Sequence, residues 1–188
     1  MTIILIRHTR VKVVPGLCYG QSDIPIADTF EEESCTILRK LHGFDILKAE
    51  IISSPLSRCT RLADKISARY RTDSRLMELD FGEWELQSWD SVDRQKSDYW
   101  MEDFVNRRCP QGESYSDMEN RVQEFFHQSL SGKSDPVILV THSGVIRIFH
   151  AWASGCPLKD TFNLKVEYGD IFTIESIDGR LGKFEKIN

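Results

Sequence analysis

The chain has 188 residues, and its 24 lysines and arginines stand against 29 aspartates and glutamates, a net charge of −5 at pH 7. This length predicts a single domain over 1–188 that can bury a core of its own. The acidic balance argues against a binder of nucleic acid or of anionic membranes, so an anionic ligand would have to be held by a few focused cations.

The five cysteines are odd in number and widely spaced, with no CxxC pair. Free thiols in a reducing cytoplasm are therefore a better interpretation than a disulfide framework or a zinc site. The apolar run Ile3–Ile6 ends at Arg7 and is too short for a signal peptide or a membrane span. We expect a cytoplasmic protein that does not bind membranes, and its oligomeric state stays open.

Strand and helix signals alternate along the first part of the chain. A β-branched apolar run at 2–6 predicts a buried strand, and the proline- and glycine-containing stretch 9–27 predicts a long loop. A helix is expected over 29–42, followed by a second strand at 50–53.

A second helix should begin directly after the strand at 50–53. Ser54 suits the N-cap and Pro55 the first helical position, which predicts a helix that runs to about Arg69. The N–H groups and the positive end of this helix would then point toward the edge where the strand ends, a place that suits an anion.

The middle of the chain, 83–113, carries aromatic side chains scattered among charged ones. We assign it as a substrate-covering insertion, although the same aromatics could simply pack the segment onto the core. The acidic residues Glu83 and Glu85 lack the histidine or aspartate spacing of a metal site, so we expect them on a solvated face.

The second half of the chain continues the alternation. It predicts a helix over 114–130, a buried strand over 136–141 and a helix over 144–153. Strands at 170–174 and 183–187 around Asp178 and Gly179 predict a terminal hairpin. Strands that alternate with helices predict an α/β fold, here a three-layer α/β/α sandwich with a mostly parallel central sheet.

Reactive side chains follow three of the predicted strands. Arg7 and His8 close the first strand, Arg58 lies just beyond the second, and His142 follows the strand at 136–141. Each could be structural by itself, but the carboxyl ends of parallel strands meet at one edge of a sheet, where such folds bind ligands. Guanidinium groups match phosphate oxygens bidentately, so the set indicates a phosphate site.

Other phosphate and hydrolase motifs are missing. The sequence has no P-loop, no GxGxxG after the first strand and no HExxH, and Thr141 stands where a nucleophile elbow would have its first glycine. We therefore expect no metal and no cofactor.

Five blocks of the sequence together resemble the histidine phosphatase (phosphoglycerate mutase-like) superfamily. They are 5–9 (LIRHT), 53–59 (SSPLSRC), 78–85 (ELDFGEWE), 110–114 (PQGES) and 140–144 (VTHSG), in the order of the family. One departure is Thr9, where the general family pattern has glycine. The stretch RHTR followed by PGLCYGQSDIP, within 7–25, is similar to the branch that contains the alpha-ribazole phosphatases of cobalamin assembly.

The resemblance implies a role for each residue at the sheet edge. His8 would be the nucleophile that forms a phosphohistidine, Arg7 and Arg58 would bind the phosphoryl oxygens, and His142 would hydrogen-bond the transferring group. A neutral imidazole already has a free lone pair and needs no separate base. The two arginines supply the positive charge that a metal ion supplies elsewhere.

The resemblance also implies which carboxylate donates the proton to the leaving group. The motif assigns Glu78, which composition alone cannot distinguish from its acidic neighbours. Gly20 and Gln21 correspond to the family's loop that touches phosphate or substrate, and Ser143 is a further substrate-binding candidate.

The resulting functional hypothesis is a metal-independent phosphomonoesterase acting on a small phosphorylated metabolite, alpha-ribazole 5′-phosphate in the assembly of the cobalamin nucleotide loop. The alternatives are a phosphoglycerate mutase, a sugar (bis)phosphate phosphatase, and a phosphate-binding module without catalysis. A mutase must keep water from the phosphoenzyme, and the short middle segment favours hydrolysis.

Overall fold

The computed structural model describes residues 1–130, 135–177 and 179–188. In these residues six strands form one sheet in the order β3-β2-β4-β1-β5-β6. The first four strands in this order pair in parallel and the last two antiparallel, which confirms the mostly parallel sheet. The strands are β1 (Thr2–Arg7), β2 (Glu50–Ser53), β3 (Arg71–Thr72), β4 (Val137–Thr141), β5 (Ile171–Ile177) and β6 (Arg180–Ile187).

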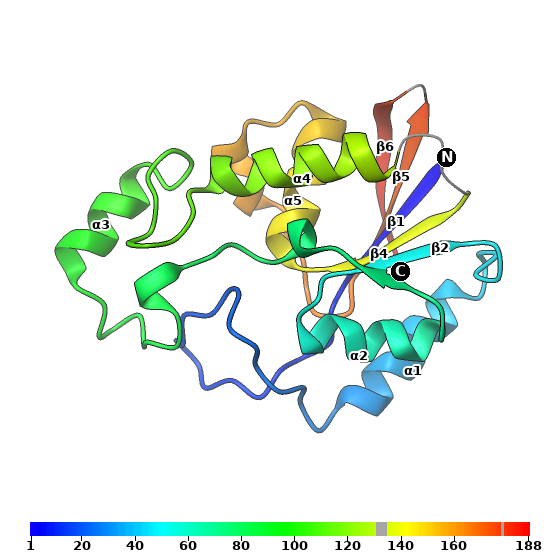
Figure 1. Ribbon diagram of the computed structural model, residues 1–188, viewed down its shortest axis with the longest axis horizontal. Helices are drawn as coiled ribbons and strands as arrows, with labels where there is room; N and C mark the ends of the chain where they lie inside the picture. The colour runs from blue at the N-terminus through cyan, green and yellow to red at the C-terminus, as the bar shows by residue number, and fades with distance from the viewer. Residues whose placement is uncertain (131–134, 178) are drawn as a thin grey trace.

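Helices cover both faces of the sheet, so the three-layer prediction is confirmed (Figure 1). One face packs against α1 (Phe30–Leu41) and α2 (Ser57–Ile66), and the other against α4 (Tyr115–Ser129) and α5 (Ser143–Ser154). Strands buried on both faces are apolar along nearly their whole length, which explains the runs Ile3–Ile6 in β1 and Val137–Val140 in β4. No helix in the described residues is long and apolar enough to span a membrane.

The start of α2 corrects the sequence prediction. The helix begins at Ser57 and ends at Ile66, rather than running from Ser54 to Arg69. The backbone N–H of Ser54 donates to the carbonyl of Val140 at 2.9 Å, so this residue still belongs to the pairing with β4. A cross-strand hydrogen bond therefore takes precedence over the N-cap signal.

The middle segment lies beyond the carboxyl ends of the parallel strands and contains α3 (Arg94–Glu102) (Figure 1). Part of it packs as core, since Trp84 and Trp100 are buried with their rings 5.7 Å apart. Trp89 stacks on Trp100 at 6.3 Å but remains 37% exposed. The aromatic side chains thus anchor the segment on the core, and one of them, Trp89, keeps part of its ring exposed.

The other predicted elements lie close to their expected positions. α4 begins at Tyr115, one residue after the predicted start, and Ser114 caps it in a capping box with Asp117. β5 and β6 form the terminal hairpin and pair over a longer stretch than predicted. The predicted turn residue Asp178 lies outside the described residues.

Candidate active site

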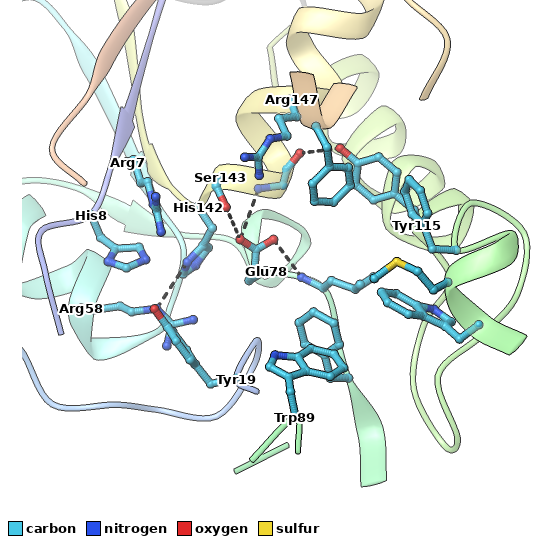
Figure 2. Close-up of a pocket in the computed structure, with 17 residues that line it drawn as sticks. Arg7, His8, Tyr19, Arg58, Glu78, Trp89, Tyr115, His142, Ser143 and Arg147 are labelled. Atoms are coloured by element: carbon cyan, nitrogen blue, oxygen red, sulfur yellow. Dashed lines mark hydrogen bonds between the residues drawn. The ribbon is translucent and has the colours of Figure 1, made fainter. Parts of the chain in front are cut away.

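The edge formed by the ends of β1 and β4 and by the start of α2 opens into a cavity of about 500 Å³ (Figure 2). Arg7 is the last residue of β1, and His8 follows it. Arg58 is the second residue of α2, and His142 is the N-cap of α5. The structure brings these four side chains into the lining of one cavity together with Glu78.

His8 is held as a neutral imidazole with a free nitrogen. Its Nδ1 lies 2.7 Å from the carbonyl oxygen of Thr9, which can only accept, so Nδ1 carries the proton and Nε2 keeps its lone pair. Burial lowers the pKa of His8 well below its usual value, with further lowering from the positive charges of Arg58 and Arg7. A nitrogen nucleophile is therefore available at neutral pH.

His142 lies against His8, with the ring centroids 5.0 Å apart and the planes at 63°. Its Nδ1 accepts from Nε of Arg58 at 3.4 Å, which leaves Nε2 as the donor to Oγ of Ser54 at 2.9 Å. Burial lowers the pKa of His142 well below its usual value, and Arg58 and His8 lower it further. Two neutral rings can pack together because neither places a charge beside the other.

The two arginines bind carbonyl oxygens rather than carboxylates. Arg58 is fully buried and donates to the carbonyls of Gly20 and, at 2.8 Å, of Ser22. Arg7 donates to the carbonyl of Val166 at 2.7 Å, and its buried Nε has no hydrogen-bond partner among the described residues. A carbonyl oxygen carries no net charge and does not neutralise a guanidinium. The positive charges of Arg7 and Arg58 can therefore interact with an anion in the cavity.

The Glu78 carboxylate is oriented by the start of α5 (Figure 2). Its Oε2 accepts from Oγ of Ser143 at 3.1 Å and from the N–H of Gly144 at 3.2 Å, and its Oε1 accepts from the N–H of Leu79 at 3.1 Å. A Cβ atom at Gly144 would collide with this carboxylate and displace it, so glycine leaves room for the carboxyl group in this position. The carboxylate thereby faces the same cavity as the two histidines.

Glu85 corrects the expectation of a solvated face. It is half-buried and accepts the backbone N–H groups of four residues: Gly20 and Ser22 at 3.0 Å, Gln21 at 2.9 Å and Phe81 at 3.1 Å. These bonds hold the loop whose carbonyls receive the Arg58 guanidinium. Gly20 and Gln21, expected to touch substrate, are not part of the cavity lining within the described residues.

The N-terminus of α2 is not free to bind a ligand. The N–H and the Oγ of Ser57 both donate to Oδ1 of Asp23, at 2.9 and 2.8 Å. The expected anion contact at this helix start is therefore taken by a carboxylate of the chain itself.

Arg147 is a cavity residue that the sequence reasoning missed. It donates from Nε to the carbonyl of Leu164 at 3.2 Å, and its guanidinium lies 4.7 Å from the ring centre of Phe162. Burial lowers the pKa of this guanidinium. Its position one helical turn after Ser143 was the available signal, because residues four apart share a helix face.

Aromatic side chains form the part of the cavity away from the histidines. Trp89 lies in this part, and Tyr19 stands near Arg58 on the other side (Figure 2). The rings of Trp100, Phe104 and Phe162 pack in one cluster with Trp89 and also line the cavity. Among the residues that the structure describes, no group of three histidines, cysteines or acids could hold a metal ion. The arrangement can bind an anion at one end and an apolar, flat group at the other.

The fold and the cavity define an α/β sandwich protein with a positively charged site at the carboxyl edge of its sheet. The family model described as the histidine phosphatase superfamily (branch 1) matches residues 3–188, and the chain belongs to this superfamily.

Several relatives match over most of their length. The chain is 28% identical to "Probable phosphoglycerate mutase GpmB" of Proteus mirabilis, over 87% of this chain and 76% of that protein. It is 23% identical to "Adenosylcobalamin/alpha-ribazole phosphatase" of Escherichia coli, over 90% and 87%. The crystal structure of the alpha-ribazole phosphatase from Shigella flexneri has the same fold, with a TM-score of 0.89, 22% identity and coverage of 100% and 96%.

Proposed function

We propose that the protein is a metal-independent phosphomonoesterase that works through a phosphohistidine on His8. The observation that carries the proposal is a neutral His8 with its lone pair on Nε2, in one cavity with two guanidinium groups that have no carboxylate partner among the described residues. Nε2 attacks the phosphorus and forms a P–N bond while the ester P–O bond breaks. Arg7 and Arg58 stabilise the charge on the phosphoryl oxygens.

Glu78 serves as the acid and then as the base. In its protonated form it donates its proton to the leaving alkoxide, which departs as an alcohol. The carboxylate then takes a proton from water, whose oxygen attacks the phosphorus and breaks the P–N bond. Inorganic phosphate leaves, and His8 and the protonated Glu78 are restored. The donors from Ser143 and Gly144 keep the carboxyl group aimed at the cavity through both steps.

For the substrate we propose alpha-ribazole 5′-phosphate, used in the assembly of the cobalamin nucleotide loop. Two observations support this choice: the likeness to a relative named for alpha-ribazole, and the aromatic end of the cavity, where Trp89 and Phe162 would contact a flat base. In this proposal the segment 83–113 is the substrate-covering part of the domain. A cavity of about 500 Å³ is within the range of small-molecule sites.

A phosphoglycerate mutase is the second candidate, favoured by the relatives of that name. The two functions differ in what happens to the phosphohistidine, since a mutase returns the phosphoryl group to the substrate and a phosphatase gives it to water. The open ring face of Trp89 suits a flat base, which a glycerate lacks. Arg147 could pair with a glycerate carboxylate, so the preference for a base depends on the aromatic side chains alone.

A phosphate-release assay in EDTA separates these functions. The substrates are alpha-ribazole 5′-phosphate, 3-phosphoglycerate, phosphoserine and 4-nitrophenyl phosphate, with 2-phosphoglycerate formation followed in parallel. We expect release to be fastest from alpha-ribazole 5′-phosphate and acid-labile phosphate to be trapped on the wild type but not on His8→Ala. The exposed His42→Ala is the matched control. Interconversion of the glycerates without phosphate release would identify a mutase.

A further inference from the structure

We propose that Arg121, locked by Glu113, is the positioning residue that holds Glu78 in place for proton transfer. This inference rests on the proposed function, in which Glu78 is the acid. It concerns a residue of α4 that does not line the cavity in the described structure. Arg121 would therefore act only through the backbone that carries the carboxyl group.

Every N–H group of the Arg121 guanidinium has an acceptor. Nε and Nη2 donate to the two oxygens of Glu113 at 2.8 and 2.9 Å, a bidentate pair. Nη1 donates to the carbonyls of Arg75 and Met77, both at 2.7 Å, and Nη2 also donates to the carbonyl of Glu78 at 2.9 Å. A guanidinium with five donors is the side chain that can hold three carbonyls and a carboxylate at once.

The segment around Glu78 depends on such side-chain bonds. It follows a single 3₁₀ turn at Ser74–Leu76 and belongs to no strand or helix, so no ladder fixes its backbone. Glu113 also accepts the N–H of Asp80 at 3.1 Å, while the carbonyl of Asp80 accepts the N–H of Glu113 at 2.9 Å. The side chains of Arg121 and Glu113 therefore hold the backbone both before and after Glu78 by hydrogen bonds.

Because the hydrogen bonds of Arg121 are buried, they depend on an arginine at this position. The Arg121 and Glu113 side chains are only 16% and 21% exposed, so water competes little for their hydrogen bonds. Lysine would keep the charge but has one nitrogen, which cannot reach all these acceptors from one position. A small displacement of a catalytic group is enough to lower its rate contribution strongly.

The test compares leaving groups in Arg121→Lys. Glycerol 2-phosphate needs a proton on its leaving alkoxide, whereas 4-nitrophenyl phosphate leaves as a stable phenolate. We expect kcat on the alkyl ester to fall by about 10²-fold. The rate of the nitrophenolate burst should stay within about threefold of wild type. The steady-state turnover that follows the burst should slow, because Glu78 is also the base of the second step. A purely structural defect would slow the first step of both substrates alike.

Arg75→Gln is the matched control. The Arg75 side chain also ties the 3₁₀ turn to α4, through Gln128 at 2.8 Å and Ser129 at 3.0 Å. It reaches no residue from 77 to 80 among its hydrogen bonds, so its loss should destabilise the protein without dependence on the leaving group. Glu113→Gln is a milder second variant should Arg121→Lys fail to fold, and it should show the same preference with a smaller loss.

A double-mutant cycle tests whether Arg121 affects the reaction through Glu78. If Arg121 acts through Glu78, Arg121→Lys should add little to the loss on the alkyl ester once Glu78→Gln is present. Full additivity, or equal losses on both esters in the first step, would overturn the positioning role while leaving the phosphatase proposal intact. Absence of leaving-group dependence in Glu78→Gln itself would instead overturn the acid role, and the positioning role with it.

Discussion

Replacing Glu85 by glutamine is expected to loosen the loop that its carboxylate holds. The carboxylate accepts four backbone N–H groups, two on each oxygen. Oε1 takes those of Gln21 and Phe81, and Oε2 takes those of Gly20 and Ser22. Whichever oxygen becomes the amide nitrogen, two N–H groups lose their acceptor and face a donor instead.

The magnitude follows from the number of bonds lost. A hydrogen bond to a charged group contributes about 1.5–3 kcal/mol, and we take the lower end because Glu85 is only half-buried. Two such bonds amount to about 3 kcal/mol in the free energy of unfolding. The carbonyls of Gly20 and Ser22 also receive the Arg58 guanidinium, so kcat should fall by about tenfold to a hundredfold.

Urea denaturation and kcat on 4-nitrophenyl phosphate measure the two effects. Glu83→Gln is the control, since Glu83 is an exposed acid two residues away with the same change in charge. If the free energy of unfolding of Glu85→Gln lies within about 0.5 kcal/mol of wild type and its kcat is unchanged, the carboxylate does not hold the loop and the prediction is wrong.

Three further predictions follow from the site. Arg58→Ala should lower kcat by about 10²–10³-fold, and Arg58→Lys should rescue poorly because an ammonium lacks the planar fork; near-normal kinetics for the alanine variant would make Arg58 structural. Burial keeps the pKa values of His8 and His142 well below 6.5, so the unfolded chain binds more protons and Tm should fall as pH drops from about 6.5 toward 5; a flat Tm would contradict this. Thr9→Val should keep the free energy of unfolding within about 1 kcal/mol, because the buried Thr9 hydroxyl has no partner among the described residues; a larger loss in denaturation would reveal one.

The sequence predicts best those features that are set by neighbouring residues. The runs of β1 and β4 are apolar because helices cover both sides of the sheet. Arg7 ends β1, and His8 and His142 directly follow β1 and β4. Knowing the strands is enough to place these three side chains at one edge. The same holds for α4, whose capping box lies within four consecutive residues from Ser114.

Features set by distant partners could not be predicted. The sequence around Ser54 is typical of an N-cap, but its N–H donates to the carbonyl of Val140. Glu85 has the sequence context of a solvated residue, but the loop 63 to 65 residues away folds against it and donates three N–H groups to its carboxylate. Arg121 reads as an ordinary helix residue, yet it reaches carbonyls 43 to 46 residues away in sequence. In each case the backbone partner carries no side-chain signature, so the pattern of residue types contains no trace of the contact.

The charge of the site explains how an acidic chain can handle an anion. The cavity lining contains three guanidinium groups and the carboxyl group of Glu78, while both histidines are neutral. The excess is therefore three positive charges while Glu78 carries the proton of the proposed acid step, and two after that proton has been transferred. Either excess attracts a phosphomonoester dianion. Since the chain as a whole is at −5, this excess is local, and binding of phosphate should therefore depend on Arg7, Arg58 and Arg147 and little on surface lysines.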